Sequence, residues 1–242
     1  MFYSKNTGET TSEFANRVSQ LYGGVKTCAC GKLDPMARGV TRVLIGNETK
    51  QMEKHLNSDK TYEFYLAIGI STDSDDIMGI IDNTSNNINA GHIYSIKKYM
   101  DTTVKNMSRQ KFHHYSALRL RKNGQRQPLW YWHSKGLLSE NEIPDKEVTV
   151  YSQEFLDIEV ISFKDYLKKV FHNLDQVKQK DNFNIDRIKE KWQKLNFNKN
   201  LYLLKFKLKV SSGFYVRMIA KSMKKDLNIP VHVYDIHRTN VS

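Results

Sequence analysis

Cysteine is scarce in this 242-residue sequence, and its two cysteines are too close together to staple a fold. Cys28 and Cys30 are one residue apart, with no third cysteine and no nearby histidine, so a framework disulfide and a four-ligand zinc site are excluded. No stretch approaches the roughly 18 apolar residues of a membrane span, and Met1 to Lys5 holds no signal-peptide core. We expect a soluble, intracellular protein with reduced thiols and no membrane partner; the nucleus, the cytoplasm and an organelle all remain open.

Acidic residues are the next shortage. The sequence has 38 Lys and Arg against 26 Asp and Glu, a net charge of +12 and a pI near 9.5, which favours a polyanionic partner such as nucleic acid. From Lys105 to Lys135 there is no acid at all. The cations of this stretch are Lys105, Arg109, Lys111, Arg119, Arg121, Lys122, Arg126 and Lys135, and the rings between them are Phe112, Tyr115, Trp130, Tyr131 and Trp132.

This combination of side chains predicts the main RNA-contact segment, residues 105–147. Cations bind phosphates, and aromatic rings stack on unpaired bases, each worth roughly 1 to 3 kcal/mol. The alternative is a solvated basic face over a few core aromatics, and the complete absence of acids argues against it.

One stretch is suited to presenting a single carboxylate. Cys30 to Gly39 sets Asp34 among two glycines, Pro35 and the cations Lys32 and Arg38. Glycine allows a sharp turn or a close approach, proline stiffens the chain after the acid, and the cations attract a polyanion. On these residues alone, an ordinary turn in which Asp34 bonds its own backbone is the simpler interpretation.

At 242 residues the chain can bury a sizeable core, as one domain or as one domain with a smaller elaboration, and we expect a single domain over residues 1–242. Helices are expected between the caps Thr10 to Ser12 and Gly23-Gly24, over 48–56 and 93–104, and from 217 to about 226. Strands are expected over 40–45, 62–70, 149–161, 201–211 and 231–238. Residues 162–200, rich in Lys and Asn, are interpreted as a part-ordered insertion with one or two surface helices, which either adds RNA contacts or is a solvated elaboration.

Three separated elements resemble, in order, motifs of the TruB family of pseudouridine synthases. Gly31-x-Leu33-Asp34-Pro35-x-Ala37-x-Gly39 resembles the family's catalytic motif. Ser58-Asp59-Lys60-Thr61-Tyr62 resembles its Ser-Asp-Lys-x-Tyr element, and Gly213-Phe214-Tyr215-Val216-Arg217 resembles its Gly-Thr-Tyr-Ile-Arg element.

The resemblance implies a catalytic trio of Asp34, Tyr62 and Arg217, with Arg217 paired to Asp34 and Tyr62 packed on the target base. Without it, Tyr62 would be a core aromatic and Arg217 a surface helix cation. The substrate-binding residues implied by the resemblance or by the basic segment are Lys5, Lys60, Tyr215, Ile236, Arg119 and Lys122. For Lys5, a solvated surface charge is the alternative.

A second turn, from Thr72 to Gly79, resembles the family's Thr-Asp-Thr-x-Asp-x-x-Gly element. Acids are costly to bury, so most of the acids in this turn are expected to face water or cations. A metal site is conceivable there, but no matching ligand cluster follows in the sequence, and the family needs no metal.

The resemblance implies a mixed α/β fold, with a central, mainly antiparallel sheet flanked by helices and the active site in a cleft. The implied reaction isomerises uridine to pseudouridine, most simply at position 55 in the T-loop of tRNA, after base flipping. It needs no cofactor. The chain ends at Ser242 without room for a PUA domain, so the eukaryotic-type tRNA enzymes are the expected relatives, acting as monomers without guide RNA, with other structured RNA as a possible partner.

Three departures from the family pattern concern RNA binding more than chemistry. Ala29 stands where the family usually has histidine, Asn6 where it has proline, and Phe214 where it has Thr or Ser. Two alternatives therefore stay open: a non-catalytic RNA-binding or RNA-folding protein on the same fold, and a structural component of a larger ribonucleoprotein.

Overall fold

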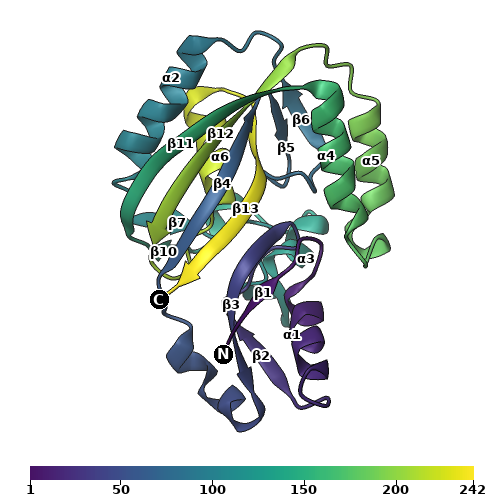
Figure 1. Cartoon of the computed structure of the whole chain (residues 1–242), viewed down its shortest axis with the longest axis vertical. Coiled ribbons are helices and arrows are strands. Elements are labelled where there is room, and N and C mark those ends of the chain that lie inside the picture. Colours follow the sequence, from purple (N-terminus) through teal and green to yellow (C-terminus); the bar gives the residue numbers. More distant parts are fainter.

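A seven-stranded sheet forms the centre of the computed structural model, which describes residues 1–242 (Figure 1). The strand order is β1, β3, β13, β4, β12, β11, with β2 pairing beside β3. Only β3 and β13 are parallel, so the expected mixed α/β fold with a mainly antiparallel sheet is confirmed. The bounds are β1 Phe2–Lys5, β2 Thr27–Cys30, β3 Ala37–Ile45, β4 Lys60–Ile68, β11 Val150–Ser162, β12 Asn200–Val210 and β13 Val231–Val241.

The alternation in the two central strands buries one face of the sheet. Phe64 of β4 stands opposite Phe206 of β12, and their rings stack 5.9 Å apart. Helices α2 (Ala90–Tyr99) and α6 (Arg217–Leu227) cover this face and share one core cluster with it. The helix expected over 93–104 is α2 followed by the π-helical turn η2 (Met100–Val104).

Residues 162–200 form a second core on the other face of the sheet. Helices α4 (Phe163–Asp175) and α5 (Ile185–Gln193), joined through η4 (Asp181–Phe183), pack side by side there (Figure 1). Tyr166 and Trp192 are fully buried, and the Tyr166 hydroxyl bonds His232 Nε2 at 2.5 Å. The segment has two α-helices, within the one or two expected, and the apolar stripes of both are buried in this second core rather than exposed to solvent.

The N-terminal strands β1, β2 and β3 carry a small core of their own. Helix α1 (Thr11–Gln20) starts with a capping box formed by Thr10 and Glu13, and buries Phe14 and Val18 against the sheet. The helix expected over 48–56 is instead a 3₁₀ helix, η1 (Gly46–His55), with no buried residue. Too few apolar side chains lie along it to pack a full α-helical face.

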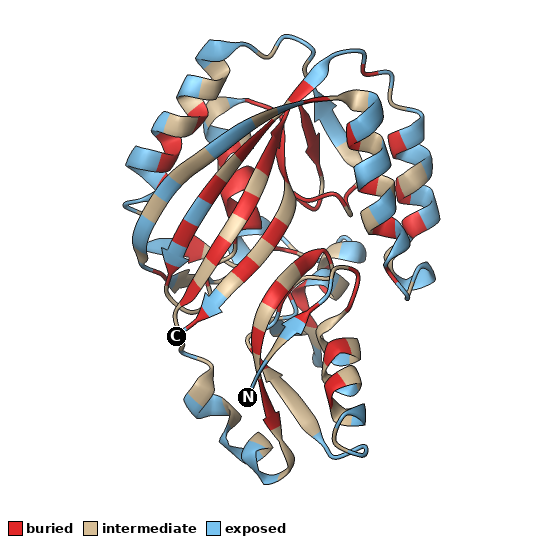
Figure 2. Ribbon diagram, viewed as in Figure 1, coloured by how far each residue is buried: buried red, intermediate tan, exposed pale blue.

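The basic segment folds as short elements at one end of the sheet. Strand β7 (Arg109–Lys111) pairs with β10 (Asp145–Glu147), and β8 (Arg119–Lys122) forms a hairpin with β9 (Gln125–Pro128). Helix α3 (Leu129–Ser134) and the turn η3 (Glu140–Glu142) follow. Trp132 of this segment is buried, whereas Trp130 is 47 % exposed. Figure 2 shows buried residues along the central strands and exposed residues on the outer faces of the helices.

A last hairpin, β5 (Ile70–Thr72) and β6 (Ile81–Thr84), continues from β4 and encloses the turn that resembles the second family element. None of the helices has the length and apolar character needed to cross a membrane.

Candidate active site

A buried lysine fastens the loop that carries Asp34. Lys5 is 1 % exposed, although a substrate contact was expected of it. Its ammonium donates to the carbonyl of Ala37 at 2.6 Å and to those of Asn6 and Pro35 at 3.0 and 3.2 Å. Burial lowers the pKa of Lys5 to about 8. Because three carbonyls use its N–H donors, the geometry favours a role in positioning the loop over direct contact with a substrate.

Asp34 and Arg217 form the ion pair that the family resemblance implies. Arg217 Nη2 donates to Asp34 Oδ1 at 2.8 Å, and Nε lies 2.8 Å from Oδ2. The Arg217 side chain is 5 % exposed and that of Asp34 is 31 % exposed. Burial alone would lower the pKa of Arg217, but the carboxylates of Asp34 and Asp76 outweigh it and raise that pKa. The arginine is thus fixed in the interior, and its carboxylate partner stays accessible from outside.

The turn between β5 and β6 holds the other side of the guanidinium. Arg217 Nη1 donates to the carbonyl of Ser74 at 3.2 Å and lies 3.4 Å from Asp76 Oδ2. Asp76 in turn accepts from the Ser74 hydroxyl at 2.6 Å and from the Met78 N–H at 2.9 Å. Asp75 and Asp76 are buried rather than facing water, and cations compensate them as expected.

An apolar wall stands beside the ion pair. Tyr62, Leu33 and Ile236 are buried in one cluster, and Ile236 pairs across β13 with Ala37 of β3. Tyr62 lies on β4, next to β13 in the sheet. Leu33 and Ala37, on either side of Asp34, share this cluster, so Tyr62 and Ile236 lie at the loop that carries Asp34.

Tyr215 completes this arrangement and is held by a residue that the sequence did not single out. Burial, with a smaller contribution from the Asp34 carboxylate, raises the pKa of Tyr215 to about 12. Its ring meets Phe112 edge-on at 5.7 Å. The Gln110 side chain forms two hydrogen bonds with the backbone of Tyr215: Nε2 donates to the Tyr215 carbonyl at 3.1 Å, and Oε1 accepts from the Tyr215 N–H at 2.7 Å. No sequence pattern pointed to this glutamine.

The match to a known family decides what this site belongs to. Residues 19–171 match the TruB family pseudouridylate synthase, N-terminal domain. The chain belongs to the TruB family.

Relatives named tRNA pseudouridine synthase B match over most of the chain or over about a third of it. The protein of that name from Ureaplasma parvum serovar 3 is 26 % identical over 230 residues, which is 95 % of this chain and 81 % of the relative. The one from Clostridioides difficile is 43 % identical over 77 residues, 32 % of this chain and 26 % of the relative.

Two solved structures share the fold of this TruB-family chain. A Cbf5-Nop10-Gar1 complex matches with a TM-score of 0.50 and 15 % identity over 98 % of this chain and 47 % of that chain. An archaeal box H/ACA sRNP Nop10-Cbf5 complex matches with a TM-score of 0.50 and 14 % identity, over 99 % and 46 %. This chain spans less than half the length of each, and the similarity confirms the pseudouridine synthase fold.

The remaining expected contact residues of this TruB-family chain differ in their surroundings. Lys60 is buried, and its ammonium donates to the carbonyls of Leu56, at 3.2 Å, and Ser58. Burial lowers its pKa to about 8, so Lys60, like Lys5, is placed to hold backbone rather than to meet a substrate. Arg119 and Lys122 lie on the β8–β9 hairpin, where Arg119 is exposed and Lys122 pairs with Glu142 at 2.6 Å.

Ala29, the departure from the family histidine, lies in β2 opposite Val43 and packs against the small N-terminal core. No group of three or more His, Cys, Asp or Glu side chains is arranged to hold a metal ion.

Proposed function

We propose that this chain is an RNA pseudouridine synthase acting on tRNA, with the T-loop uridine at position 55 as its target. The observation that carries the proposal is the Asp34–Arg217 pair, in which a buried arginine contacts both oxygens of a carboxylate that stays 31 % exposed. Membership of the TruB family and the names of the relatives support the same chemistry. An intracellular place of action follows from a tRNA substrate.

The reaction breaks the bond between the ribose and uracil N1, turns the uracil, and joins its carbon 5 to the ribose. Carbon 5 loses its proton and N1 takes up a proton, so the product is an isomer of the substrate. We assign Asp34 the attack on the sugar or the base, because its side chain is 31 % exposed and an RNA can reach it, whereas its partner Arg217 is buried. Arg217 holds it in place with two contacts. Tyr62 packs on the uracil, and Tyr215 and Ile236 line the pocket that receives it.

A base inside a helix cannot reach this pocket, so the uridine must be flipped out of its stack. A T-loop costs less to open than a duplex, because its bases are already partly unstacked. This favours the T-arm as the recognised part of the tRNA. We expect one protein molecule to suffice, because Asp34 and Arg217 both come from this chain. We also propose that no guide RNA is needed.

The β8–β9 hairpin and the start of α3 are the proposed RNA surface. Arg119, Arg121 and Arg126 are exposed there, and Trp130 offers an exposed ring beside them. Phosphates of the T-arm would meet the arginines while the ring stacks on an unpaired base.

The test is conversion of an unmodified tRNA transcript by the purified chain without added cofactor or metal. We expect pseudouridine at position 55, and the Asp34→Asn variant should bind the transcript with near wild-type Kd and form none. Activity in Asp34→Asn would refute the assignment of the aspartate.

The alternative, a non-catalytic RNA-binding protein, is favoured by one observation: Ala29 replaces the family histidine. Salt-sensitive tRNA binding without conversion, in a well-folded wild-type chain, would move the assignment to that function.

A further inference from the structure

Behind Arg217 lies a turn residue in an unusual backbone conformation. Asp75 has φ of +62°, in the left-handed region that non-glycine residues seldom adopt, and its side chain is 1 % exposed. Its two neighbours in the chain, Ser74 and Asp76, both contact Arg217 Nη1. The conformation of Asp75 therefore decides whether a carbonyl and a carboxylate reach the guanidinium together.

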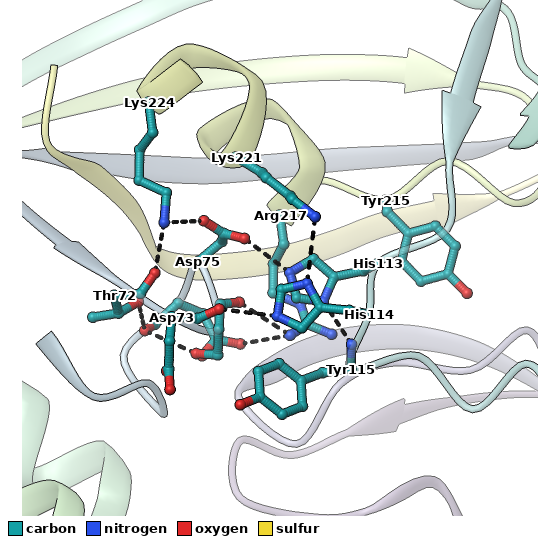
Figure 3. Close-up of polar contacts among 12 residues, drawn as sticks. Thr72, Asp73, Asp75, His113, His114, Tyr115, Tyr215, Arg217, Lys221 and Lys224 are labelled. Atoms are coloured by element: carbon teal, nitrogen blue, oxygen red, sulfur yellow. Dashed lines mark hydrogen bonds and ion pairs between the residues drawn. The ribbon is translucent and has the colours of Figure 1, made fainter. Parts of the chain in front are cut away.

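Two side chains from distant elements hold Asp75 in this conformation (Figure 3). His113 Nε2 lies 3.0 Å from Asp75 Oδ2, and Lys224 Nζ lies 2.6 Å from Oδ1. Lys224 also donates to the carbonyl of Thr72 at 2.7 Å, so its ammonium connects the first residue of the turn with Asp75. The Asp75 carbonyl accepts from the Val233 N–H at 2.9 Å, which ties the turn to β13.

The hydrogen bonds fix the protonation of His113. Its Nδ1 accepts from the backbone N–H of Tyr115 at 3.1 Å, so the proton sits on Nε2 and is donated to Asp75. Burial lowers the pKa of His113 well below its usual value, and the ring is neutral. Lys224 then supplies the positive charge that the buried Asp75 carboxylate needs.

A second histidine and lysine, His114 and Lys221, lie next to His113 and Lys224 in Figure 3. His114 Nε2 donates to the Asp73 carbonyl at 3.1 Å, and Lys221 Nζ lies 3.4 Å from His114 Nδ1. The two histidine rings stack 4.3 Å apart. The start of the proposed RNA-binding segment is thus pinned to the turn that holds Arg217.

We propose that Asp75, His113 and Lys224 are positioning residues for the reaction: they lock the turn that orients Arg217, and through it Asp34. Neither hydrogen bond nor ion pair joins any of them to Asp34, whose polar partner is Arg217. The proposal rests on the proposed function for its kinetic consequence, but its structural consequence for Arg217 can be measured without any catalysis.

The test compares Lys224→Met with Lys225→Met, a matched change on the same helix at an exposed lysine. On a T-arm RNA, Lys224→Met should lower the single-turnover conversion rate at least about tenfold, near 1.4 kcal/mol in the barrier, and change the Kd less than twofold. Lys224→Arg should restore most of the rate. Lys225→Met should leave both quantities unchanged.

The second readout is the NMR signal of the Arg217 Nε–H, identified by its loss in Arg217→Lys. Lys224→Met should shift or broaden this signal, and Lys225→Met should not. If the wild type converts no RNA but the signal responds in this way, the proposed function fails and the positioning role stands. A folded Lys224→Met variant with an unchanged signal and rate overturns the positioning role, as does an effect confined to Kd.

Lys224→Met leaves the buried Asp75 charge unpaired, so it could unfold the chain. The double variant Asp75→Ala/Lys224→Met removes the charge together with its partner. We expect it to fold, with a conversion rate reduced at least about tenfold, and a wild-type rate in this variant also overturns the proposal.

Discussion

At the scale of single residues, the site depends on a flat, forked cation. Arg217 reaches Asp34 through Nε and Nη2 while Nη1 turns back to Ser74 and Asp76. A lysine ammonium has one nitrogen and cannot serve both sides of this geometry.

Arg217→Lys is therefore expected to lower the conversion rate on the order of 100-fold, because misplacing Asp34 by about 1 Å costs that much. Single-turnover kinetics on a T-arm RNA would measure it. Arg17→Lys is the matched control, since Arg17 also forks onto a carboxylate, that of Glu9, at 2.6 and 3.0 Å, and forms no hydrogen bond or ion pair with Asp34. Equal rates in the two variants would argue against the pairing as the basis of catalysis.

Lys5 gives a second prediction at this scale. Lys5→Met leaves the carbonyls of Asn6, Pro35 and Ala37 without their donor, which should cost roughly 1 to 3 kcal/mol of unfolding free energy. The conversion rate should fall while the Kd for RNA stays near that of the wild type. Urea denaturation and RNA titration measure the two effects, and a variant of normal stability with weakened RNA binding would restore Lys5 to the substrate contacts.

At the scale of elements, the strands were the most predictable part of the molecule. In β4 and β12 apolar residues alternate with polar ones, because only one face of each strand points into the main core. This period of two can be recognised in the sequence. The capping box of α1 involves only Thr10 and Glu13, three residues apart, so it too can be recognised in the sequence. Where these elements lie was therefore readable without a structure.

Other elements depend on partners that sequence patterns do not reveal. Strand β1 is only four residues long and is defined by its pairing with β3. Helices α4 and α5 are held in place because Tyr166 and Trp192 pack in the second core. The sequence of this segment hides that packing, since it is rich in Lys and Asn and therefore resembles a disordered segment. Asp34, Tyr62 and Arg217 were found through the family motifs, whereas Gln110 and His113 act through contacts with residues remote in the chain.

The attachment of α4 to the sheet can be tested at one hydroxyl. Tyr166→Phe removes the bond to His232 and leaves Nε2 of that buried ring without a partner, so we expect a loss of roughly 1 to 3 kcal/mol in unfolding free energy. Tyr151→Phe is the control, because the Tyr151 hydroxyl bonds Asp59 at the exposed surface. Urea denaturation of both variants checks this, and equal stability would show that the second core does not need the bond.

The β8–β9 hairpin gives a prediction about salt. Arg121→Gln should weaken tRNA binding and reduce the slope of log Kd against log salt concentration by about 0.7 to 0.9, the contribution of one phosphate contact. Lys168→Gln, an exposed change on α4, should leave the slope unaltered. An unchanged slope for Arg121→Gln would move the RNA surface away from this hairpin.

At the scale of the whole molecule, buried neutral histidines make stability depend on pH. His232 donates from Nδ1 to the Ile70 carbonyl at 2.8 Å and accepts from Tyr166, and burial lowers its pKa to about 4. Between pH 6.5 and 4 the unfolded chain therefore binds a proton at His232 that the folded chain does not. The free energy of unfolding should fall by about 2 kcal/mol from this group between pH 7 and 5.

Urea denaturation at the two pH values measures that loss. His232→Asn, which keeps a donor and an acceptor but does not titrate in this range, should lose correspondingly less on acidification. The same loss in both proteins would assign the acid sensitivity to other groups.

The position of β13 in the sheet has a consequence for how the protein is made. This strand lies between β3 and β4, and Arg217 is 183 positions after Asp34, so the middle of the sheet and half of the ion pair come from the end of the chain. A polypeptide still emerging from the ribosome holds the aspartate without its arginine and the first strands without the one that joins them. Until Arg217 has been synthesised, the site lacks its cation. We therefore expect products of termination before Arg217 to carry the proposed RNA-binding hairpin but to convert no uridine.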